Sequence, residues 1–172
     1  MGRRRAKLVV RLGQDGAVID IAVVTAQDWR LWRELRLAAL AEAPEAFGST
    51  LADWSGLGDT EARWRSRLDD VALNLVLTLD GNTAGMVSAL SPDGDGQVEL
   101  ISLWITPAAR GRGVGDEAIR RVLAWADDAH QGSSVMLSVK LDNDRAHRLY
   151  ERHGFVDAGP SPEDPTELLM RR

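Results

Sequence analysis

Apolar and polar positions follow two different periods along this chain, and the longest apolar runs have the alternation and composition of strands. Val, Leu, Ile and Trp dominate these runs, and turn residues separate them. We expect strands at residues 18–24, 72–79, 83–90, 98–105, 135–140, 155–158 and 167–170, with residues 7–12 as a further candidate. Asp80-Gly81-Asn82 separates two of the runs and predicts a tight hairpin turn.

Helical spacing occupies the segments between these strands. Thr25, with Asp28 three residues later, has the pattern of a capping box, and Pro44 ends the apolar stripe that follows. We expect four helices, at residues 25–43, at residues 59–68, after residue 115, and from residue 143 to Gly154. This mixture of strands and helices predicts an α+β layered fold.

The length of 172 residues suits one domain, residues 1–172, in which residues 1–16 form a peripheral extension. Hydrophobic residues make up 44% and charged residues 27%, an ordinary composition for a soluble protein. Because the chain has no cysteine, disulfides, thiolate nucleophiles and cysteine metal sites are excluded, and we expect no metal. We expect a cytoplasmic protein, because no apolar run is long enough to span a membrane and no signal-peptide core follows the basic start.

A glycine-rich segment connects the strand at 98–105 to the helix that follows it. Thr106 and Pro107 end the strand, and Arg110-Gly111-Arg112-Gly113-Val114-Gly115 comes next. The first N–H groups of a helix lack partners, the helix dipole is positive there, and glycine allows close approach, so the segment suits a diphosphate. It lacks the spacing of a P-loop or a dinucleotide fold, and a tight strand-to-helix connection would also use glycine.

A second motif follows the strand at 135–140. It reads Asn143-x-x-Ala146-x-x-Leu149-Tyr150-x-x-x-Gly154-Phe155. Together with Arg110-x-x-Gly113-x-Gly115, it resembles the two signatures of the GNAT (Gcn5-related) N-acetyltransferase family, over roughly residues 17–172. The segment Pro44–Thr50 resembles one bacterial branch of that family. The resemblance implies a GNAT-like fold, with a mostly antiparallel twisted sheet of six to seven strands flanked by about four helices.

The activity implied by the resemblance is acetyl transfer from acetyl-CoA to a primary amine of a small molecule or peptide, by direct attack in a ternary complex. Glu99 is the candidate general base, acting directly or through water, although a rim carboxylate paired with an arginine would fit the same position. Tyr150, the chain's one tyrosine, is the candidate general acid for the leaving thiolate, the alternative being an amphipathic core residue.

Acetyl-CoA binding is assigned by the resemblance to the end of the central strand, the glycine-rich loop and the cap of the last helix. These residues are Leu103, Trp104, Ile105, Arg110, Gly111, Arg112, Gly113, Val114, Gly115 and Asn143. The Trp104 side chain is expected to pack, and Asn143 would either bind the pantetheine arm or cap its helix. Asp116 and Glu117 are expected to face solvent in the first helical turn, where acids are favourable.

The acceptor pocket is assigned, also by resemblance, to the loop with Phe47 and Trp54, although both aromatic residues could instead plug the edge of the core. The net charge of −5 disfavours nucleic-acid binding and mildly favours amines. Two further activities stay open, a protein N-terminal or lysine acetyltransferase and a CoA-binding regulatory domain without turnover. Glu99, Tyr150 and the loop glycines argue against the last, and a homodimer also stays open.

Overall fold

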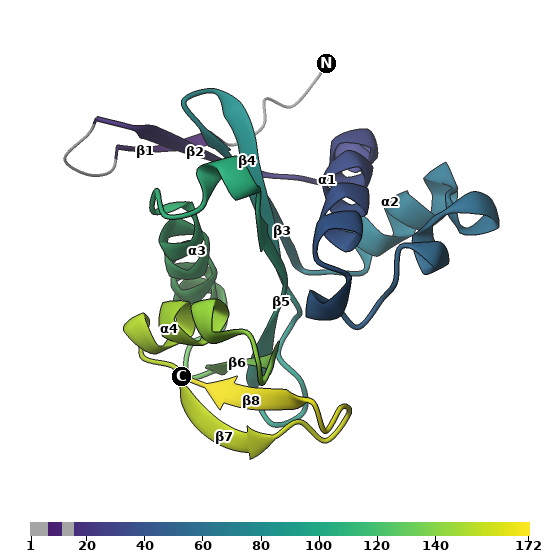
Figure 1. The fold of residues 1–172 in the computed structure, drawn as a ribbon. Helices are drawn as coiled ribbons and strands as arrows, with labels where there is room; N and C mark the ends of the chain where they lie inside the picture. Colours follow the sequence, from purple (N-terminus) through teal and green to yellow (C-terminus); the bar gives the residue numbers. More distant parts are fainter. Residues whose placement is uncertain (1–6, 12–15) are drawn as a thin grey trace.

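An eight-stranded sheet forms the middle layer of the protein in a computed structural model, which describes residues 7–11 and 16–172 (Figure 1). The strands are β1 (Lys7–Arg11), β2 (Val18–Val23), β3 (Leu73–Leu79), β4 (Asn82–Ala89), β5 (Gln97–Ile105), β6 (Ser134–Lys140), β7 (Val156–Pro160) and β8 (Glu167–Arg171). Their order in the sheet is β1-β2-β3-β4-β5-β6-β8-β7, and every neighbouring pair is antiparallel except β5 with β6.

The predicted α+β fold with a mostly antiparallel sheet is confirmed, with one strand more than expected. The extra strand is β1, which pairs with β2 at the sheet edge from Lys7 opposite Ala22 to Arg11 opposite Val18. The rest of the predicted extension, residues 1–6 and 12–15, lies outside the described residues.

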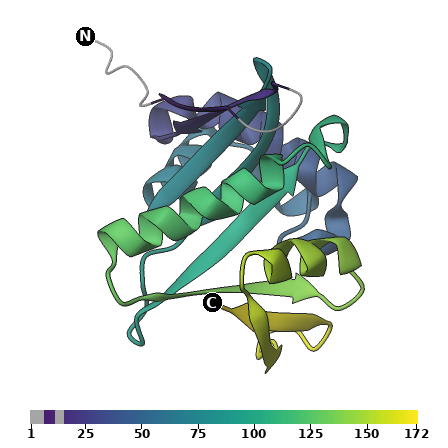
Figure 2. The ribbon, with the colours of Figure 1, turned by 90° about the vertical axis from the view of Figure 1, so that its left-hand side faces the viewer.

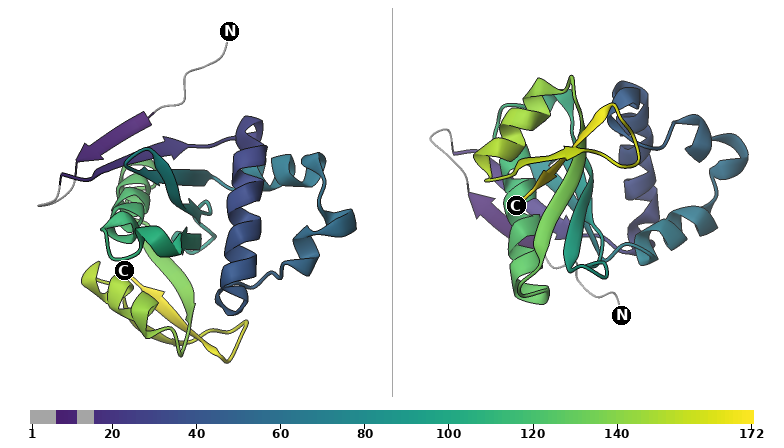
Figure 3. Two further views of the ribbon diagram at one scale, coloured as in Figure 1. Left: turned by 45° about the horizontal axis from the view of Figure 1, so that its top comes forward. Right: turned by 90° about the horizontal axis from the view of Figure 1, so that it is seen from below.

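Helices cover both faces of the sheet, two on each side (Figures 1 and 3). On one face lie α1 (Trp29–Glu42) and α2 (Glu61–Asp69), and on the other lie α3 (Val114–Ala129) and α4 (Asp144–Arg152). The Thr25–Asp28 capping box is present and starts a short 3-10 turn that leads into α1. The loop between α1 and α2 is less open than its polar sequence suggests, because it contains three short 3-10 helices, Pro44–Ala46, Ala52–Trp54 and Gly56–Gly58.

Each face of the sheet has its own apolar core. Ile119 and Val122 of α3 pack with the strand residues that point to their side, such as Leu100 and Leu137. On the other face a smaller cluster, which contains Trp32, Trp64 and Trp104, lies between the sheet, α1 and α2. Strand alternation thus divides β5 between two environments, one on the α3 side and one on the α1/α2 side.

The two parallel strands separate soon after they meet. β5 and β6 pair only from Gln97–Glu99 to Ser134–Met136, after which β5 stays with β4 and β6 stays with β8. A bulge in β5 accompanies the separation, since Ser102 has a φ of 57° and the register with β4 shifts between Met86 and Ser88. Figure 2 shows the two strands diverging in the middle of the sheet.

Candidate functional site

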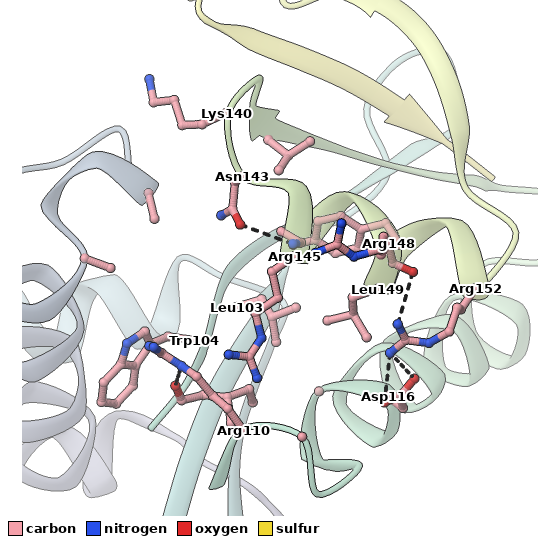
Figure 4. Close-up of a pocket in the computed structure, with 18 of the residues that line it drawn as sticks. Leu103, Trp104, Arg110, Asp116, Lys140, Asn143, Arg145, Arg148, Leu149 and Arg152 are labelled. Carbon is pink, nitrogen blue, oxygen red and sulfur yellow. Dashed lines mark hydrogen bonds and ion pairs between the residues drawn. The ribbon is translucent and has the colours of Figure 1, made fainter. Parts of the chain in front are cut away.

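A cleft of about 510 Å³ opens where β5 and β6 diverge (Figure 4). Its walls are the ends of these strands, the glycine-rich loop before α3, one side of α4 and the end of α1. The residues on the facing strand ends are Leu103–Ile105 of β5 and Ser138–Lys140 of β6. Each of these segments pairs with an outer neighbour and has a free inner edge, so an extended ligand with amide groups can hydrogen-bond to both.

The glycine-rich loop places free N–H groups at the end of this cleft. Gly113 is the N-cap residue of α3 and has a φ of 84°, in the left-handed region that favours glycine. The N–H of Glu117 donates to the carbonyl of Gly113 at 3.0 Å, so the N–H groups of Gly113 to Asp116 precede the first hydrogen-bonded turn. Gly115 is close to α4, because an added Cβ would lie 3.1 Å from a methyl carbon of Leu149. The N-terminus of α3 is thus suited to an anion such as a diphosphate.

Each of the two arginines of the loop is already paired with a carboxylate of this chain. Arg110 donates from Nε to the carbonyl of Ile105 at 3.0 Å and from Nη2 to Glu42 Oε2 at 2.6 Å. Glu42, at the end of α1, also accepts from Trp104 Nε1 at 3.0 Å, and hydrogen bonds from Arg110 and Trp104 lower the pKa of this carboxyl. Arg112 forms an ion pair with Asp80 at 3.1 Å and does not line the cleft.

Basic side chains from α4 and β6 line the cleft, and two of them are paired, Lys140 with Asp164 and Glu167 and Arg152 with Asp116. Arg145, Arg148 and Arg152 line it from α4, and Lys140 lines it from β6 (Figure 4). The three arginines are spaced i, i+3 and i+7, so they share one helix face. Sequence reasoning missed these residues, although that spacing within the second motif was a usable signal.

The expectation that Asp116 and Glu117 face solvent is wrong. Asp116 accepts from Arg152 Nη2 at 3.0 Å and lies 3.1 Å from His153 Nε2, so it joins α3 to α4. Glu117 is only 7% exposed and pairs with Arg120. Val114, expected in the loop's ligand set, has its side chain in the α3-side core, so only its backbone is available to a ligand.

Tyr150 lines the cleft from α4 and is 7% exposed. Its ring packs edge-on against Phe155, with 5.8 Å between centroids, and no hydrogen-bond partner for its hydroxyl is present among the described residues. Burial raises the pKa of Tyr150 far above its ordinary value, so the phenol keeps its proton at neutral pH and can donate it. Asn143 also lines the cleft, while its side-chain oxygen accepts from the N–H of Ala146 at 3.1 Å as a helix cap.

Glu99 lies at the start of β5, before the strands separate, and is not in the lining of the cleft. It is four residues before Leu103, roughly 13 Å along a strand. Burial raises its pKa, and the charges of Glu163 and Glu167 raise it further. None of the ion pairs found in the described part of the chain involves Glu99, which leaves the alternative of an arginine-paired rim carboxylate without support.

The structure separates the two aromatic residues expected at the acceptor. Phe47 lines the cleft, and its ring lies 4.4 Å from the guanidinium carbon of Arg36. Trp54 lies away from the cleft, where it stacks on Trp64 at 4.4 Å between ring centroids and on the guanidinium of Arg63. Phe47 is therefore placed to meet a ligand, and Trp54 packs within the α1–α2 layer.

Two features of the described residues bear on other classes of protein. No helix in residues 16–172 is long and apolar enough to cross a membrane. The same part of the chain holds no group of three or more His, Asp or Glu side chains arranged to bind a metal ion.

Solved structures with the same fold include two acetyltransferase-related proteins. A ribosomal-protein-S5-alanine acetyltransferase from Vibrio fischeri superposes with a TM-score of 0.74 at 12% identity, over 96% of each chain. A Salmonella typhimurium protein solved with its cofactor acetyl-CoA has a TM-score of 0.70 at 18% identity, over 90% of this chain and 92% of that chain. At these identities the likeness establishes the fold.

Curated relatives match part of the chain. The rat N-acetylaspartate synthetase is 38% identical over 86 residues, which are 50% of this chain and 28% of the relative. A GCN5-like protein acetyltransferase of Mycobacterium tuberculosis is 45% identical over 62 residues, 34% of this chain and 28% of the relative. The chain therefore spans little more than a quarter of the length of these relatives.

The family profile described as "Acetyltransferase (GNAT) family" matches residues 29–155. That stretch runs from the start of α1 through both motifs to the end of α4, and it includes both strands that form the cleft. Because the match covers well over half of the chain, the protein belongs to the GNAT acetyltransferase family.

Proposed function

We propose that the protein is an acetyl-CoA-dependent N-acetyltransferase that acts on a primary amine of a small molecule or peptide, by direct attack in a ternary complex. The observation that carries the proposal is the cleft itself. Two free strand edges, the N-terminus of α3 and the buried phenol of Tyr150 meet in one cavity. A cavity used only for binding would have no need of an unpartnered phenol in its wall.

The residues present fit acetyl-CoA, whose chemical contribution is an acetyl group on a thioester. The N–H groups of Gly113 to Asp116 would hold its diphosphate. The free edges at Leu103–Ile105 and Ser138–Lys140 would pair with the amides of its pantetheine arm. Arg145 and Arg148 would add positive charge for its remaining phosphate.

Three steps of the transfer are assigned to this chain. Glu99 removes the proton of the acceptor ammonium, so that the amine nitrogen can form a bond to the acetyl carbon. A backbone N–H of the Leu103–Ile105 segment stabilises the oxyanion. As the carbon–sulfur bond breaks, the attached nitrogen releases its second proton to water, and Tyr150 donates its proton to the departing thiolate and is reprotonated by water.

The position of Glu99 favours transfer of the first proton through water. The carboxyl lies on β5 before the strands separate, whereas Leu103 and Trp104 line the cleft. Its raised pKa brings it closer to the working range of a general base. Glu42 does line the cleft, but its two hydrogen bonds and lowered pKa make it a poor base and a good anchor for Arg110.

The reaction is tested by incubating the protein with acetyl-CoA and a panel of amino acids, polyamines, aminoglycosides and peptides. CoA release is followed, and acetylated products are identified by mass spectrometry. We expect release that depends on one class of amine. Tight acetyl-CoA binding without any product would overturn the proposal and favour a regulatory CoA-binding domain.

A further inference from the structure

Two arginines, one buried and one half-buried, lie on the α1/α2 side of the sheet without a carboxylate partner among the described residues. Arg36 belongs to α1 and Arg67 to α2. Neighbouring arginines on the same helices do have such partners, since Arg33 pairs with Asp59 and Arg65 pairs with Glu61. Arg30 and Arg63 of these helices also lack an ion pair in the described part of the chain, but both are exposed, so low exposure without a carboxylate is what distinguishes Arg36 and Arg67.

Arg36 is 8% exposed, and its Nη1 is fully buried with no hydrogen-bond partner among the described residues. Its Nη2 donates to Ser49 Oγ at 3.2 Å, and its guanidinium stacks on the ring of Phe47. A buried guanidinium with an unused N–H is costly, because charge and donor have both lost water.

Arg67 is held by neutral groups from three strands. It donates from Nη1 to Asn74 Oδ1 at 3.1 Å and from Nη2 to Ser88 Oγ and Ser102 Oγ, both at 3.4 Å. The last two distances are long for hydrogen bonds, so the fork retains donor capacity for a better acceptor.

The electrostatics agree with this geometry. Burial, and after it repulsion from Arg67, lowers the pKa of Arg36 to about 10. Burial likewise lowers the pKa of Arg67 to about 10, although the charge of Asp70 opposes the shift. Two like charges that repel each other in a desolvated place are stabilised by an anion between or beside them.

Both arginines are next to residues of the cleft. Phe47 lines the cleft and its ring stacks on the guanidinium of Arg36, so this one side chain contacts both the cleft and Arg36. Ser102, which contacts Arg67, directly precedes Leu103 in the cleft wall, and its left-handed backbone forms the bulge that separates the strands. The two arginines thus contact a lining residue of the cleft and a residue next to one, and they belong to α1 and α2, which cover the sheet face opposite α3 (Figure 3).

We infer that the acceptor is an amine that also carries a carboxylate, of the size of an amino acid, and that Arg36 and Arg67 bind this carboxylate beside the strand separation. The inference rests on the proposed function for the role of the ligand as acceptor. The arginines are specificity residues and take no part in proton transfer. The negative net charge of the chain favours the amine end of such a ligand, and the two guanidinium groups select its carboxylate end.

Three acceptors with one carbon skeleton test the inference: L-aspartate, L-asparagine and L-aspartic acid diamide, which carry two, one and no carboxylates. The ratio of kcat/KM between a carboxylate acceptor and the diamide is measured for the parent, Arg67→Gln, Arg36→Gln and the control Arg30→Gln. Arg30 is an exposed residue of the same helix as Arg36. Comparing ratios between variants at one pH cancels differences in amine basicity.

We expect the parent and Arg30→Gln to prefer a carboxylate acceptor. Arg36→Gln and Arg67→Gln should each lose that preference by about 10- to 100-fold, as expected for a hydrogen bond to a charged group. Acetyl-CoA affinity should stay unchanged in all four proteins. A preference retained in both folded variants, or a parent that prefers the diamide, would overturn the inference. Turnover of long acidic peptides in place of these small amines would also overturn it.

Binding provides a readout that does not require turnover. L-Aspartate should raise the melting temperature of the parent more than the diamide does, and should not do so in Arg67→Gln. If this shift is seen but no acetylated product forms, the carboxylate site stands and the proposed transferase activity fails. If Arg36→Gln does not fold, the result for Arg67→Gln alone tests the inference. Arg67→Lys should restore part of the shift in melting temperature that L-aspartate causes.

Discussion

Replacing Gly113 by alanine tests whether the N-terminus of α3 is the anion site. Gly113 has a φ of 84°, and a non-glycine residue in this left-handed conformation costs about 1–2 kcal/mol. For a chain of this size, such a cost lowers the melting temperature by roughly 2–8 °C. If the alanine leaves the left-handed region, the N–H groups that follow turn away from the cleft. Forming the binding-competent loop then costs this same free energy, which weakens acetyl-CoA binding roughly 5- to 30-fold.

Gly132→Ala is the matched control. Gly132 has a φ of 86°, and an added Cβ there would meet no atom within 4 Å. It lies in the turn between α3 and β6, outside the lining of the cleft. Both variants should lose similar stability in thermal unfolding, but only Gly113→Ala should lose affinity in a calorimetric titration with acetyl-CoA. Equal affinities in the two variants would refute the assignment of the loop as the diphosphate site.

The remaining predictions concern three charged residues. Glu99→Gln should lower kcat at neutral pH with partial recovery at alkaline pH, where more amine is already deprotonated; an unchanged pH–rate profile would remove Glu99 from the mechanism. The same variant should be more stable than the parent at neutral pH, because the raised pKa of Glu99 means that its ionisation destabilises the folded state. In denaturant melts, this difference in stability should vanish below the ordinary carboxyl pKa. Hydrogen bonds from Arg33 and Trp64 lower the pKa of Asp59 from 3.8 to about 2, so Asp59 should stabilise the parent above its unfolded pKa and progressively less as the pH falls towards 2. In Asp59→Asn the stability should therefore depend less on pH in that window, and parallel stability curves for the two proteins would contradict the assignment. Arg148→Ala should weaken acetyl-CoA binding and reduce its dependence on salt, whereas Arg30→Ala should change neither.

Features with local causes could be predicted from the sequence. Thr25 with Asp28 specifies a helix start through neighbouring hydrogen bonds, and the glycines after Pro107 specify a strand-to-helix turn. The hairpin of β3 and β4 follows in the same way from its turn residues. The resemblance of the second motif to the family signature then pointed to Tyr150, which the fold brings to the cleft.

Features that depend on distant partners could not be predicted in this way. The sequence around Ser102 does not predict a left-handed residue, yet the bulge there accompanies the separation of β5 from β6. Trp54 resembles Phe47 in its local setting, and only the packing of α1 on α2 sends it away from the cleft. The burial of Arg36 and the partial burial of Arg67 likewise depend on the packing of α1 and α2 on the sheet. A single domain over residues 1–172 stays a prediction.

The most direct test of the proposed chemistry compares Tyr150→Phe with the parent, using the amine identified by the acceptor panel. The substitution keeps the ring that packs on Phe155 and removes the one proton that the phenol can give to the thiolate. Because general acid catalysis typically contributes about 10²–10⁴-fold, kcat should fall within that range while the Kd for acetyl-CoA stays the same. A Tyr150→Phe variant that turns over like the parent would contradict the account and leave the tyrosine as a packing residue in the wall of the cleft.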